Sequence, residues 1–192
     1  MNVQTHVLLA FLVALPISAE SATKQDVVKI LGRNPGDAAA YACFTRHYTK
    51  KHLATHPDQN VTDMRLFVNR AEGDDVSYTL DMQVDFREQK KPLVLSNYCE
   101  PDSDPKGAIT CPMDCEGGRI DIRVKNQSAI LVEIPLGARV YDPPKEDGVP
   151  LRGKFGDDDK LFRLDRAALT DCLPAIKDEA LRGKVAKGVI TQ

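Results

Sequence analysis

The side chains best suited to chemistry lie close together in residues 43–68. This stretch holds Cys43 and three of the four histidines of the chain, at His47, His52 and His56. A thiol and three imidazoles are ligands that copper and zinc accept, and His52 and His56 would share one face of a helix. The spacing therefore raises the hypothesis of a copper or zinc site formed by His47, His52 and His56.

Two features of the same stretch weigh against a metal site. Pro57 disfavours the helical conformation at His56, so the shared helix face is interrupted. In an oxidising compartment Cys43 serves better as one end of a disulfide. Metal binding is therefore the alternative hypothesis and not the first, and no cofactor is expected.

The five cysteines indicate a disulfide framework. The candidates are Cys43, Cys99, Cys111, Cys115 and Cys172. The preferred pairing joins Cys43 to Cys172, and Cys99 to either Cys111 or Cys115. The sequence does not select between the last two, and one thiol is left over.

The segment between Cys111 and Cys115 allows other chemistry. Its two thiols and the thioether of Met113 form a soft ligand set of the kind that a cuprous ion prefers. A redox-active thiolate is disfavoured, because Asp114 and Glu116 are acidic neighbours. A structural disulfide is the favoured interpretation.

Catalytic motifs are absent from the sequence. It contains no phosphate-binding loop, dinucleotide-binding fingerprint, nucleophile elbow, metalloprotease helix motif or C-x-x-C pair. The three aspartates at residues 157–159 lack the spacing of a calcium loop and predict a solvated turn. We therefore expect a protein that is not an enzyme.

Residues 1–19 have the features of a secretory signal peptide. An apolar run over residues 7–15 is followed by Pro16 and by the small residues Ser18 and Ala19. The run is shorter than the roughly 20 residues that cross a bilayer. We predict a periplasmic or secreted protein with no membrane span. Residues 20–192 would form a single domain, with its core over about 40–173 and a helical tail over 174–192.

The charge of the chain is nearly balanced. Its 26 basic and 28 acidic residues leave a net charge of −2. This balance gives no electrostatic reason to expect binding to nucleic acid or to anionic lipid.

Hydrophobic alternation predicts a mainly β fold. Residues 76–87 alternate apolar and polar side chains without a fault, which is typical of a strand with one buried face. Further strands are expected at residues 41–48, 64–68, 93–98, 108–111, 120–124, 130–134, 138–141 and 160–164. The connections are short, so neighbouring strands should be antiparallel, and about eight of them would form a small closed barrel or a sandwich. Short helices are expected at residues 23–33, after Thr49, and from Pro174 onward.

A non-enzymatic binding or protein-interaction module is the function that best fits these features. Its partner would be a protein or a cell-envelope component. A small apolar ligand inside a hollow barrel is a further alternative. Tyr78, Met82 and Phe86 on the inner face of the predicted barrel are large enough to fill it, which favours a filled interior.

Overall fold

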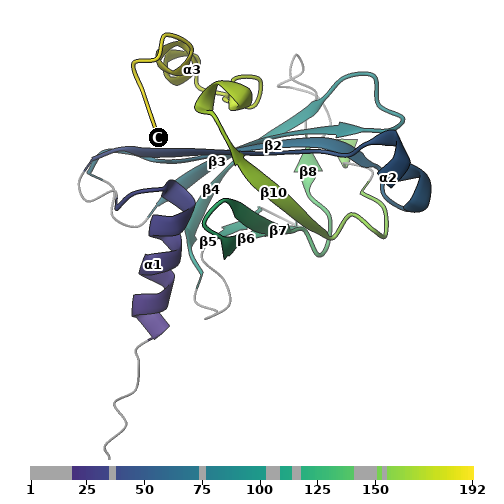
Figure 1. Ribbon diagram of the computed structural model, residues 1–192, viewed down its shortest axis with the longest axis horizontal. Coiled ribbons are helices and arrows are strands. Elements are labelled where there is room, and N and C mark those ends of the chain that lie inside the picture. The colour runs from purple at the N-terminus through teal and green to yellow at the C-terminus, as the bar shows by residue number, and fades with distance from the viewer. Residues whose placement is uncertain are drawn as a thin grey trace, which may run out of the picture.

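The computed structural model describes residues 19–34, 38–73, 77–102, 109–113, 118–140, 151–152 and 155–192. Residues 1–18 of the predicted signal peptide and the cysteine at position 115 lie outside these ranges. Figure 1 shows a barrel with helices placed around it.

Eight antiparallel strands close into a barrel in the order β1-β2-β3-β4-β5-β6-β7-β10. They are β1 Ala40–His47, β2 Val61–Arg70, β3 Tyr78–Phe86, β4 Leu93–Pro101, β5 Ile109–Pro112, β6 Arg119–Asn126, β7 Ala129–Glu133 and β10 Leu161–Ala167. The predicted antiparallel meander is confirmed, and it closes as a barrel. The short strands β8 (Arg139–Val140) and β9 (Leu151–Arg152) pair outside the barrel sheet.

The helices are α1 (Ala19–Leu31), α2 (Lys50–Thr55), the single-turn 3-10 helix η1 (Leu169–Cys172) and α3 (Glu179–Ala186). The described part of helix α1 already includes Ala19, several residues before the predicted start at residue 23. The C-terminal helix was expected to open at Pro174, but α3 begins only at Glu179. Asp178 is its N-cap and accepts a hydrogen bond from the backbone N–H of Leu181. Pro174 instead follows η1 in a turn, so the prediction for residues 174–178 was wrong.

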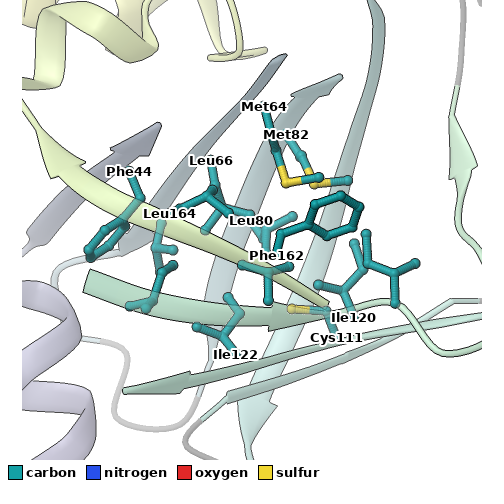
Figure 2. Packing of buried hydrophobic residues seen from close by; sticks show 14 of the residues in the cluster. Phe44, Met64, Leu66, Leu80, Met82, Cys111, Ile120, Ile122, Phe162 and Leu164 are labelled. Atoms are coloured by element: carbon teal, nitrogen blue, oxygen red, sulfur yellow. The ribbon is translucent and has the colours of Figure 1, made fainter. Parts of the chain in front are cut away.

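The interior of the barrel is filled by apolar side chains. Every second residue of β3, from Tyr78 to Phe86, belongs to the core, as the alternation predicts. Side chains from different strands fill the interior, and Met64, Met82 and Phe162 belong to one buried cluster (Figure 2). A cavity that held even one water would leave accessible surface on its lining. The exposed fraction is 0% for Phe44, Met64, Leu66, Leu80, Met82, Val84, Ile120, Ile122 and Leu164. The described part of the interior is thus packed, as eight strands permit.

Helix α1 packs at the end of the barrel where β1 begins. Its last turn places Ile30 and Leu31 in the core. Arg166, near the end of β10, donates hydrogen bonds from Nη2 to the carbonyl oxygens of Lys29 (2.6 Å) and Ile30 (2.9 Å). These carbonyls end the helix and lack intrahelical donors, so the guanidinium caps α1. Burial lowers the pKa of Arg166.

Helix α2 and the segment before β10 lie at the other end of the barrel, where β1 and β3 end and β2 begins. Leu53 of α2 packs against the core. The ring of Phe155 meets that of Phe86 edge-on at 5.2 Å between centroids and that of Phe162 at 6.5 Å. Both ends of the barrel therefore have described side chains packed against the core.

A second, smaller core lies on the outer face of β1 and β2. Phe67 points outward from β2 and is covered by Leu169, Ile176 and Val185 of the C-terminal segment. A disulfide between Cys43 and Cys172 joins this segment to β1. The C-terminal segment is therefore a structural part of the domain.

Candidate functional site

The three histidines of the predicted metal site do not all interact with one another: His47 pairs with Asp63, whereas His52 and His56 contact each other. His47 ends β1, and its largely exposed ring lies with Nδ1 2.7 Å from Oδ1 of Asp63. His47 and Asp63 are cross-strand partners on β1 and β2, which explains the contact. His52 and His56 belong to α2 and its C-terminus.

His52 is held by a hydrogen-bonded chain. Its Nε2 lies 2.9 Å from Oε1 of Gln59, while Nε2 of Gln59 donates to the carbonyl oxygen of Val61 at 2.8 Å. Because Oε1 can only accept, the proton of this bond is on Nε2 of His52. Gln59 is almost completely buried, so these hydrogen bonds fix the orientation of the partly exposed imidazole.

His56 leaves the helix, as Pro57 predicts, yet it still contacts His52. It is the C-cap of α2, with φ −129° and ψ 74°, and its Nδ1 donates to the carbonyl oxygen of His52 at 2.9 Å. The two rings stack with 4.1 Å between centroids, and His52 in turn stacks on Tyr48 at 4.9 Å. The Arg46 guanidinium lies 5.0 Å from the Tyr48 ring centroid. Burial raises the pKa of Tyr48, and Arg46 offsets part of that rise.

Arg87 links α2 to the turn that follows β3 through side-chain hydrogen bonds. Its Nε donates to the carbonyl oxygen of Gln59 at 2.5 Å. Its Nη2 donates to the carbonyl oxygens of Leu53 (2.6 Å) and His56 (2.7 Å). A single guanidinium thus satisfies three carbonyls around the end of α2, where a positive charge is also favoured by the helix dipole.

Asp159 joins the segment before β10 to the start of β2. Its carboxylate accepts hydrogen bonds from the backbone N–H groups of Asn60 (2.7 Å), Val61 (3.1 Å) and Gly156 (2.9 Å). Burial raises the pKa of Asp159, and these three donors offset part of the rise. A Cβ at Gly156 would lie 1.8 Å from the Asp58 carbonyl oxygen, so the close approach requires glycine.

The prediction of a solvated turn at residues 157–159 was therefore half right. Asp157 and Asp158 are exposed, whereas Asp159 has an exposed fraction of 0%. Three adjacent aspartates carry no local signal that distinguishes the buried one. Its role depends on residues almost a hundred positions away in the chain.

The described residues do not assemble the predicted metal ligands. Among them, no three His, Cys, Asp or Glu side chains gather where they could share an ion. Cys43 is bonded to Cys172, and Cys111 is bonded to Cys99. These two bonds follow the pairing preferred from the sequence. Cys115, the remaining thiol of the soft ligand set, lies outside the described residues.

Asp81 is a buried carboxyl that the alternation pattern assigns to a solvated face. It does point outward from β3, but the C-terminal segment covers it and leaves 3% of it exposed. Its Oδ2 accepts a hydrogen bond from the Lys177 N–H at 3.2 Å, while its Oδ1 is buried with no partner among the described residues. Burial raises the pKa of Asp81, and contacts with Ser96 and Lys177 offset part of the rise.

We predict that Asp81→Asn stabilises the protein at neutral pH by about 1 kcal/mol. A carboxyl whose pKa is raised by folding contributes stability below its unfolded-state pKa and loses that contribution as pH rises through the folded-state value. The advantage of the variant should therefore shrink on acidification. Urea unfolding at neutral and at acidic pH measures this difference, with the exposed Asp58→Asn as the control. A variant less stable than the parent at neutral pH would show that the carboxylate is favourably paired.

Comparison with known proteins assigns no family to this chain, so its structural class rests on the fold alone. No protein-family model, no curated protein and no solved structure matches this chain. Within the described part of the chain, no helix combines the length and the apolar character needed to cross a membrane. The fold defines a small disulfide-stabilised β-barrel domain.

Proposed function

We propose that this protein is an exported, non-enzymatic interaction module that binds a protein or cell-envelope partner through its outer surface. The observation that carries the proposal is the filled barrel. The side chains that would line a ligand cavity, such as Phe44, Leu80 and Met82, have no exposed surface. Binding inside the barrel would require the core to repack, which typically costs a few kcal/mol.

The contacts of His52 and His56 support the same proposal. The side chains of His52 and His56 form hydrogen bonds within α2 and its following loop. Such bonds fix the shape of the surface at this end of the barrel. We therefore assign these histidines a structural role in presenting the α2 surface.

Export is supported by the two disulfides and by the leader-like residues 1–19. Disulfides persist mainly in oxidising compartments, where small domains use them for stability. Fractionation of the native host tests this part of the proposal. The mature chain should appear in the periplasm or the medium, and recovery of the full-length chain from the cytoplasm would contradict it.

Native mass spectrometry of the untagged protein, purified from that compartment, tests the mode of binding. We expect a chain whose mass is lower by about 4 Da than that of the reduced form, because each bond removes two hydrogens. No small molecule should be lost when the sample is denatured. A metal ion or an apolar ligand that leaves on denaturation would overturn the proposal of a surface-binding module.

A further inference from the structure

We propose that the interaction surface is a basic corner at the α2 end of the barrel and that it binds an acidic segment of a partner protein. The corner comprises residues 49–60, which include α2, and residues 87–92 of the β3–β4 turn. This inference rests on the proposed function, since it names the surface and the partner of the same module. Figure 1 shows α2 projecting at one end of the barrel, away from α1.

The two parts of the basic corner are held against each other. The Arg87 backbone N–H donates to the Asn60 carbonyl oxygen at 2.9 Å, in addition to the side-chain bonds of Arg87 to Leu53, His56 and Gln59. The β3–β4 turn therefore lies directly beside the end of α2. The two segments that carry these charges, about forty residues apart in the sequence, are therefore in contact through Arg87.

This surface carries an excess of positive charge that the chain as a whole does not have. Lys50, Lys51, Lys90 and Lys91 are all exposed. Their ammonium groups form no ion pair with a described residue. Including Arg87, the corner has five basic side chains, against Asp58 and Glu88 as its acidic ones. The segment before β10 adjoins the corner, because the Asp158 N–H donates to the Asp58 carbonyl oxygen at 3.4 Å. Its exposed Asp157, Asp158 and Lys160 lower the excess of basic over acidic side chains from three to two. The net charge of the whole chain is −2, so this excess is local.

The internal polar groups of the corner are used for its own structure. The Arg87 guanidinium binds backbone carbonyls, and Gln59 holds His52. The lysine ammonium groups are therefore the ones that remain available to a partner. Because these bonds fix the backbone of α2 and the loop after it, a partner would order only the flexible side chains of Lys50 and Lys51 there.

The charge distribution favours a protein partner over a bilayer. Attraction of basic side chains to an anionic membrane contributes only about 1 kcal/mol per residue, and stable attachment commonly needs an apolar anchor as well. The large apolar side chains that are exposed in the described structure are Tyr98, Leu136, Leu161 and Val189. None of them belongs to the basic corner. Glutamate and aspartate side chains of a partner would pair with the lysines and accelerate its association.

A labelled oligoglutamate peptide serves as the probe, with affinity measured by fluorescence anisotropy on the folded, disulfide-bonded protein. We expect binding that weakens as salt is raised. The double variant Lys50→Glu/Lys90→Glu should bind about tenfold more weakly or worse. The matched control, Lys125→Glu/Lys187→Glu, changes the net charge by the same amount at exposed positions away from the corner, and it should retain most of the affinity.

Equal losses in the two double variants would overturn the assignment of the corner, because binding would then follow net charge alone. Vesicles of phosphatidylglycerol, with phosphatidylcholine vesicles as the reference, form the second arm. Corner-dependent binding to the anionic vesicles without binding to oligoglutamate would overturn the acidic-protein partner in favour of a membrane. Either failure leaves the filled barrel of the proposed function untouched, since that is tested separately by native mass spectrometry.

Discussion

Removing the disulfide between Cys43 and Cys172 is expected to lower the free energy of unfolding by about 5 kcal/mol. The bond closes a loop with a sequence separation of 129 residues, so it restricts the unfolded chain strongly. Both cysteines are completely buried, and the bond joins β1 to the C-terminal segment. Urea denaturation of Cys43→Ala/Cys172→Ala measures the loss.

The second disulfide is the matched control. Cys99 and Cys111 are separated by 12 positions, so their removal as Cys99→Ala/Cys111→Ala should cost about 3 kcal/mol. Equal losses would show that loop entropy does not dominate. If Cys43→Ala/Cys172→Ala is too unstable to purify, hydrogen exchange on the partly reduced protein shows which segment loses its protection first. The segment that covers Phe67 should then exchange before the barrel strands.

Replacing Asp159 by alanine is expected to cost about 3 kcal/mol. The carboxylate satisfies three backbone N–H groups, and its removal leaves these donors in a buried site. The variant also releases the segment before β10 from β2, although Phe155 still packs on Phe86 and Phe162. Thermal or urea unfolding of Asp159→Ala reports the change.

Two further variants serve as controls. One removes the charge of Asp159 and keeps an acceptor, and the other changes a neighbouring aspartate of the same turn. Asp159→Asn keeps one acceptor oxygen at the same place and should lose less stability than Asp159→Ala. Asp157→Ala changes a side chain that is 93% exposed, and its effect should stay within about 0.5 kcal/mol. A comparable loss in Asp157→Ala would mean that the turn itself, and not the buried carboxylate, carries the stability.

Local patterns in the sequence are sufficient for much of the barrel. A strand exposes alternate residues to opposite faces, so the period of two in residues 76–87 predicts the inward side chains of β3 from neighbouring positions alone. The same holds for the helical turn after Thr49, whose side chain accepts a hydrogen bond from the His52 N–H at 3.2 Å as an N-cap. These features depend on residues a few positions apart.

The proposed interaction surface does not follow from such local patterns. The histidine spacing raised the hypothesis of a metal site, but the fold directs His47 to Asp63 and His52 to Gln59. Neither segment alone predicts the hydrogen bonds of Arg87 to α2, because no spacing in the sequence identifies which distant carbonyl an arginine will bind. The net charge of the whole chain likewise gives no sign of the basic corner, whose lysines come from α2 and from the β3–β4 turn.

The periodicity of the strands, the turns between them and the residues available for disulfides follow from neighbouring positions in the chain. Which outward-facing side chains are buried depends instead on how distant segments pack. Asp81 obeys the alternation and Asp159 lies in a run of aspartates, yet both are buried because segments remote in the chain pack over them. Alternation reports the face of a strand, whereas burial depends on what covers that face, and this is a long-range property of the fold.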